Sequence, residues 1–92
     1  MATGPREFCH NEIRAILSDM SAAQKIGKAY LTAHPHEKCF EFLYQDVFEG
    51  RIDRQTLAIM KARDFQDEDM VMVQGWYLAR TEARLMALAA LV

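Results

Sequence analysis

The residues best suited to chemistry in this sequence are its two cysteines and the histidines near them. Cys9 is followed by His10, and the second cysteine closes a short segment that holds two more histidines. Thiolates and imidazole nitrogens are the ligands that zinc prefers, and four of them in tetrahedral arrangement make a closed structural site. The candidate zinc ligands are Cys9, His34, His36 and Cys39. Their spacing departs from the usual two close pairs, so histidines in an exposed turn are the competing interpretation.

The cysteines also bear on covalent cross-linking. Two cysteines in 92 residues are too few for a scaffold that disulfides hold together. Two packed thiols are the favoured interpretation of Cys9 and Cys39. A single bridge between them stays open, because it depends on how close the two backbones come.

Motifs for catalysis or cofactor binding are missing from the sequence. Nucleophilic catalysis needs a serine or cysteine beside a positioned base, and no local signature of that kind surrounds either residue type. The four glycines are scattered singly and cannot form a phosphate-binding loop. There is also no haem attachment motif. We therefore expect a protein that is not an enzyme and that uses no cofactor.

Length, charge and hydropathy narrow the class of protein further. Ninety-two residues with 51% hydrophobic content suit one small domain, residues 1–92. Eleven basic and thirteen acidic side chains lack the basic excess of a nucleic-acid binder. No stretch is long enough to span a bilayer. No export signal is recognisable in this chain, so we expect a periplasmic location if a leader has been removed and a cytoplasmic one otherwise.

The hydrophobic pattern predicts an all-α fold, an irregular bundle of four to five short helices. Ser21 and Gln24 stand at the spacing of a capping box, and Gly27 predicts a close approach of a neighbouring element. The alternating segment 70–73 is expected to be extended. The predicted helices cover residues 5–19, 21–33, 36–49, 54–64 and 76–91.

The last predicted helix is apolar on two sides. One side carries leucines at core spacing, and Glu82 and Arg84 on its flanks are expected to fix neighbouring helices through charge contacts. The other side is rich in alanine, with a tryptophan at one end, which indicates a second packing surface. Either another helix of the domain or a partner protein would cover it, and Trp and Arg are frequent in interface hot spots. The candidate partner-binding residues are Trp76, Ala79, Arg80, Ala83 and Ala87.

This same segment carries a family resemblance. Residues 75–88, GWYLARTEARLMAL, resemble the closing motif of a group of small bacterial proteins of uncharacterised function, often made with a twin-arginine export signal. In that group the motif runs approximately DGWxLSxTEARLCAL. Residues 26–31, IGKAYL, and the following His34 and Pro35 are similar to an upstream motif of the group. Gln74, Ala79 and Met86 stand where the group has Asp, Ser and Cys.

A more distant similarity links the chain to the small subunits of gluconate, sorbitol and glucose dehydrogenases, which escort and dock on a flavoprotein. From the alanine-rich side of the last helix we expect a non-enzymatic helical accessory protein that docks on a larger protein partner, and the similarity suggests a dehydrogenase subunit as one candidate partner. Two alternatives stay open at this point. One is a structural zinc-binding module, and the other is a small inhibitor protein of phage or plasmid type.

Overall fold

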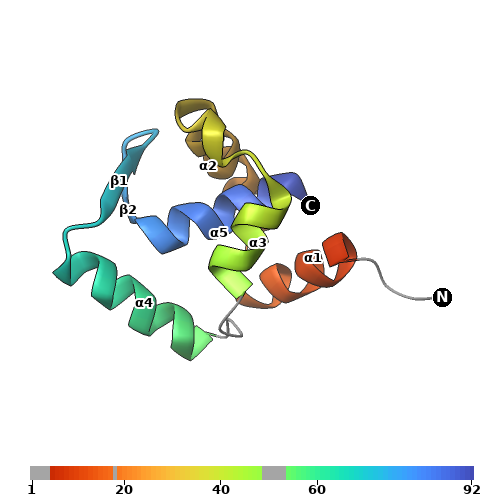
Figure 1. Ribbon diagram of the computed structural model, residues 1–92, viewed down its shortest axis with the longest axis horizontal. Helices are drawn as coiled ribbons and strands as arrows, with labels where there is room; N and C mark the ends of the chain where they lie inside the picture. The colour runs from red at the N-terminus through yellow and green to blue at the C-terminus, as the bar shows by residue number, and fades with distance from the viewer. Residues whose placement is uncertain (1–4, 18, 49–53) are drawn as a thin grey trace.

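The computed structural model describes the backbone of residues 5–17, 19–48 and 54–92, and the side chains of that set apart from residues 5–10 and 48. This part of the chain is mostly helical, with one small β-hairpin between the last two helices (Figure 1). The elements are α1 (Pro5–Ile16), α2 (Met20–Ala33), the short 3-10 helix η1 (Pro35–Glu37), α3 (Phe40–Phe48), α4 (Arg54–Gln66), β1 (Met70–Val73), β2 (Trp76–Ala79) and α5 (Arg80–Leu91).

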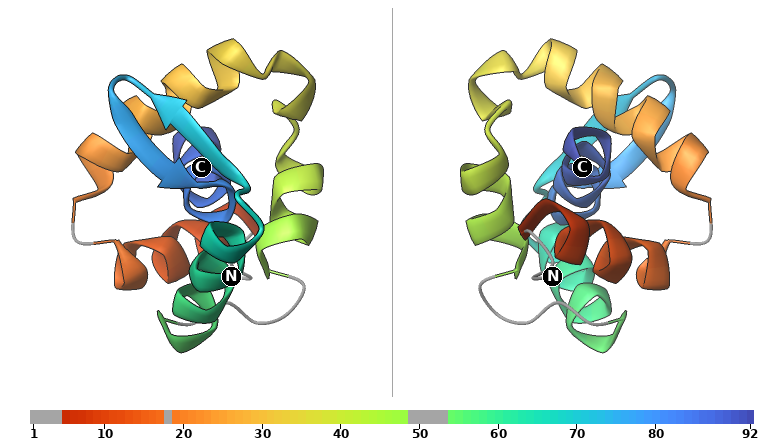
Figure 2. Two further views of the ribbon diagram at one scale, coloured as in Figure 1. Left: turned by 90° about the vertical axis from the view of Figure 1, so that its left-hand side faces the viewer. Right: turned by 90° about the vertical axis from the view of Figure 1, so that its right-hand side faces the viewer.

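Helix α5 lies at the centre of the fold. Seen end-on in Figure 2, it is surrounded by α2, α3, α1, α4 and the hairpin, and it packs against each of them. Leu85, Ala87 and Leu88 are fully buried as a result. A helix that is covered on most sides must be apolar on most sides. This explains the two apolar faces in the sequence: other elements of the chain cover both.

The closest helix pair is α2 with α5. A Cβ atom added to Gly27 would overlap the backbone of Met86 and Ala87, so the helices meet where only a hydrogen fits. Ala83 and Ala87 are fully buried in the core beside this contact. Small residues allow two helix backbones to approach closely and to gain dispersion contacts along their length. The close approach that the sequence predicts at Gly27 is confirmed.

The hairpin corrects the all-α prediction. The segment expected to be extended, 70–73, is strand β1, but residues 76–79 form its antiparallel partner β2 where we expected the first turn of the last helix. Gln74 and Gly75 connect the strands with φ angles of 49° and 83°. Two successive positive φ angles make the tight turn whose twist matches a two-residue hairpin. The helix therefore begins four residues later than predicted, at Arg80.

Several helix boundaries also differ from the predicted ones. Helix α2 is capped by Asp19, whose Oδ1 accepts from the Ala22 N–H at 3.0 Å, and Ser21 lies within the helix instead of capping it. The region expected to be one helix over 36–49 is split into η1 and α3. Helix α1 ends at Ile16, earlier than expected, and α4 extends to Gln66.

No helix in the described part of the chain has the length and hydropathy needed to cross a membrane.

Candidate functional site

The candidate zinc ligands do not gather into a site where the structure describes them. His34 stacks on the ring of Tyr30, with centroids 4.4 Å apart, and its Nδ1 lies 3.1 Å from the Tyr30 carbonyl oxygen. His36 and Cys39 are exposed, and Cys39 is a free thiol. Among the described side chains, no three metal-ligating groups come together. The side chain of Cys9 lies outside the described residues, so its pairing with Cys39 stays untested.

The predicted partner-binding face is not one continuous surface, which corrects the geometry inferred from a helical wheel. Ala79, Ala83 and Ala87 are buried in the core and offer no surface to a partner. Residues 76–79 lie on a strand, where side chains alternate between two sides instead of following a helical face. Trp76 is exposed, and Arg80 is partly exposed. These two of the five predicted residues remain accessible.

The exposed tryptophan belongs to a cluster at the end of the hairpin. Trp76 and Tyr77 are each 61% exposed, and Met72 is 65% exposed. Met72 and Tyr77 are direct cross-strand partners and so lie on one side of the sheet, whereas Trp76 is the partner of Val73 next to the turn. We call Met72, Trp76 and Tyr77 the hairpin patch. It places three large side chains in solvent within six residues of chain.

One side of the hairpin faces the core, and Trp76 lies on that side, next to the turn. Val71, Val73 and Leu78 are buried and belong to the hydrophobic cluster that also contains Leu85 and Leu88 of α5. Because strand side chains alternate in direction, anchoring this side points Met72 and Tyr77 outward. Trp76, on the anchored side, is exposed at the turn. The strands that carry the hairpin patch are therefore packed against the core.

Hydrogen bonds fix the base of the hairpin, where β2 passes into α5. The Arg80 N–H donates to the Asp69 carbonyl at 3.0 Å, and Arg80 Nε donates to Asp69 Oδ1 at 3.1 Å. The Thr81 N–H donates to Asp64 Oδ2 at 2.8 Å. Helix α5 has no capping side chain of its own at Ala79, so the Asp64 carboxylate from α4 supplies the acceptor. Asp69 thus positions the hairpin, and Asp64 positions the start of α5.

A polar chain continues from this junction to α2, η1 and α3. Arg80 donates to the Tyr30 hydroxyl at 3.3 Å, and that hydroxyl donates to Glu37 Oε1 at 2.7 Å. Arg84 Nε donates to the same Glu37 oxygen at 2.9 Å and Arg84 also donates to Asp46 Oδ2 at 3.2 Å. Glu37 is buried, so the hydrogen bonds from Tyr30 and Arg84 satisfy a carboxylate that has lost water. These contacts tie three elements, α2, η1 and α3, to α5.

The network changes the acidity of its central groups. Burial by itself raises the pKa of Glu37, but hydrogen bonds from Arg84 and Tyr30 and the charge of Arg84 outweigh it and hold the pKa below its ordinary value. Burial raises the pKa of Tyr30, opposed by the hydrogen bond from Arg80 and assisted by Glu37. Glu37 is therefore charged and Tyr30 neutral at neutral pH. Both groups are kept in the states that suit a structural hydrogen-bond network.

Sequence reasoning found part of this arrangement. The charge contacts expected on the flanks of the last helix are confirmed: Glu82 pairs with Lys61 at 3.4 Å, and Arg84 pairs with Glu37. Tyr30 and Asp69 were not predicted to have a role. One available signal was Gln74-Gly75 between two short apolar runs, which favours a hairpin and would have placed Tyr77 on a strand.

Comparisons with known proteins add no family to this description. The chain matches no family model, no curated protein and no solved structure. The functional argument therefore depends on the residues and contacts described above.

Proposed function

We propose that this chain is a non-enzymatic accessory protein that docks on a larger protein partner through the hairpin patch. The observation that supports the proposal is the exposure of three large side chains, Met72, Trp76 and Tyr77, at one end of the fold. Aromatic residues and methionine are enriched at protein interfaces, and tryptophan and tyrosine are frequent hot spots. The three side chains belong to one hairpin, with Met72 and Tyr77 on one side and Trp76 on the other beside the turn, whereas the exposed Ile59 and Phe65 lie on α4.

The contacts that hold the hairpin in place favour binding through the hairpin patch. Val71 and Leu78 anchor the strands to the core, and Asp69 and Arg80 close the hairpin at its base. A surface that already holds its bound conformation loses less conformational entropy when a partner arrives. The polar network therefore has a role in this proposal: it keeps the hairpin in place, and its charged groups are occupied with one another.

The absence of an enzymatic activity is also part of the proposal. Tyr30, Glu37 and Arg84 are residue types that can act in catalysis, but here they bond to one another across the helices. The pKa of Glu37 is lowered, which makes it a weaker base. A dehydrogenase subunit remains the candidate partner that the sequence resemblance suggests.

Site-specific photocrosslinking in the cells that make the protein tests the proposal. A photoreactive phenylalanine analogue replaces Tyr77 in one sample and Ile59 in another. Ile59 is a matched control because it is 55% exposed and lies on α4 instead of the hairpin. We expect a crosslink to one larger protein from position 77 and none to that protein from position 59. Equal crosslinking from both positions, or none from position 77, would contradict docking through the hairpin patch.

A further inference from the structure

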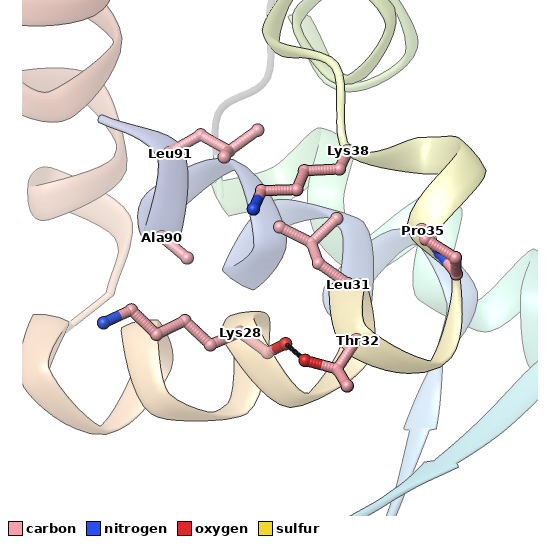
Figure 3. Close-up of a pocket in the computed structure, with 7 residues that line it drawn as sticks. All are labelled: Lys28, Leu31, Thr32, Pro35, Lys38, Ala90 and Leu91. Atoms are coloured by element: carbon pink, nitrogen blue, oxygen red, sulfur yellow. Dashed lines mark hydrogen bonds between the residues drawn. The ribbon is translucent and has the colours of Figure 1, made fainter.

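A pocket lies on the side of α2 that faces the end of α5, away from the hairpin patch. Its volume is about 430 Å³, within the range of about 300 to 1,000 Å³ that is usual for small-molecule sites. Figure 3 shows the residues that line it, which come from α2, from η1 and the residue after it, and from the last turn of α5. They are Lys28, Leu31, Thr32, Pro35, Lys38, Ala90 and Leu91.

The floor of the pocket is apolar. Leu31 is buried in the core cluster, and Leu91 packs against that cluster while remaining partly exposed. Pro35 and Ala90 add further carbon surface and no side-chain polar atom. The hydroxyl of Thr32 donates to the Lys28 carbonyl at 2.9 Å and so has no hydrogen left for a ligand. This part of the pocket would accept hydrocarbon.

The charged groups of the pocket are all cationic. Lys28 and Lys38 extend from two different segments on either side of the floor (Figure 3). Neither ammonium group forms an ion pair with a side chain that the structure describes. No carboxylate lines the pocket. The whole chain carries a net charge of −2, whereas the lining of this pocket carries a positive charge from two lysines.

We propose that this pocket binds a small amphiphilic anion, a carboxylate with a hydrocarbon body of medium length. The hydrocarbon would lie on Leu31, Pro35 and Leu91, and the carboxylate would accept hydrogen bonds from the lysines. Apolar burial and charge-assisted hydrogen bonds would then act on opposite ends of one ligand. The proposal is independent of docking through the hairpin patch, because the two surfaces share no residue.

A structural reading of the lysines makes the opposite prediction. Cations are favoured near the C-terminal end of a helix, and the pocket lies at that end of α5. On that reading Lys28 and Lys38 interact with the helix end and no ligand binds. A binding experiment distinguishes the two interpretations, because only the first predicts that a ligand binds.

Decanoate is the probe, and isothermal titration with the full chain measures its binding. We expect one site, with octanoate about fifteenfold weaker, because each buried methylene contributes about fourfold in affinity. Decylammonium, which has the same body and the opposite charge, should bind at least tenfold more weakly than decanoate. No saturable decanoate binding, many equivalent sites, or equal binding of decylammonium would overturn the proposal.

Variants locate the site. The double substitution Lys28→Gln and Lys38→Gln should weaken decanoate at least tenfold, whereas Arg63→Gln, an exposed cation on α4, should leave the affinity unchanged. If the double variant does not fold, methyl shifts in the unmodified protein decide the location. Decanoate should shift the methyl signals of Leu31 and Leu91 and leave those of Ile59 unmoved. Unchanged affinity in a folded double variant, or shifts only outside the pocket, would contradict the assignment.

Discussion

Asp69 and Arg80 are joined twice across the base of the hairpin. The backbone N–H of Arg80 donates to the Asp69 carbonyl at 3.0 Å, and its side chain donates to the Asp69 carboxylate at 3.1 Å. The first contact continues the backbone hydrogen bonds between the two strands. The second holds the side chain of Arg80, the first residue of α5 after β2. The pair therefore links the position of the hairpin patch to the position of the central helix.

Asp69→Ala should loosen the hairpin without unfolding the protein. Asp69 is about half exposed, so its ion pair contributes less than about 1 kcal/mol to the free energy of unfolding. The backbone bond to Arg80 remains, but the hairpin should open more often. Amide hydrogen exchange measures this: we expect faster exchange in β1 and β2 and little change in α2. Asp67→Ala, which removes a neighbouring exposed carboxylate, is the control and should leave the rates unchanged. Equal effects of both substitutions would mean that the Asp69 contact does not hold the hairpin.

Gly27→Ala should destabilise the fold, although alanine favours helices. The added methyl group would meet the backbone of Met86, which cannot move without shifting α5. The cost of such overpacking is about 1 to 3 kcal/mol, beyond the gain of up to about 1 kcal/mol in helix propensity. Urea unfolding measures the net loss. Lys25→Ala, at an exposed position of the same helix, should change the free energy of unfolding by less than about 0.5 kcal/mol. A more stable Gly27→Ala protein would contradict the contact.

The lowered pKa of Glu37 predicts a dependence of stability on acid. Because the folded pKa lies below the ordinary value of 4.5, the contribution of Glu37 is fully present above that value and is lost as the pH falls through the folded pKa. Glu37→Gln should remove this part of the acid dependence and lower the stability at neutral pH by about 2 to 3 kcal/mol. Urea unfolding from about pH 3 to pH 7 measures both effects. Glu41→Gln, an exposed carboxylate, should retain the acid dependence of the unmodified protein, and identical curves for both variants would count against the network.

Helical periodicity predicted most of the helices because burial follows one face of helices such as α1 and α3. Ile13 of α1 and Leu43 of α3 are fully buried in segments predicted as helices. The hairpin escaped prediction because residues 76–79 also fit a helical wheel with the segment that follows. The hydrophobic pattern alone does not show that β2 ends and α5 begins between residues 79 and 80. The hairpin is set by the turn at Gln74 and Gly75, which have positive φ angles.

The candidate site was only partly predictable for a related reason. Trp76 was named as a candidate partner-binding residue with its exposure left open, and it is exposed. The alanines beside it were assigned to the same surface because a single helix was assumed. An alanine face is equally suited to a partner and to a neighbouring helix, and only the packing of α2 against α5 decides between them. Tyr30 and Glu37 meet through a chain reversal at η1 that sequence spacing does not specify.

The affinity of the crosslinked partner for two alanine variants tests the central claim most directly. Trp76→Ala removes the largest side chain of the hairpin patch, and Ile59→Ala removes a comparably exposed apolar side chain from α4. Docking through the patch predicts that Trp76→Ala raises the dissociation constant about 30-fold, the effect of one hot-spot residue, and that Ile59→Ala changes it less than about twofold. A folded Trp76→Ala protein that binds this partner as tightly as the unmodified chain would contradict the claim.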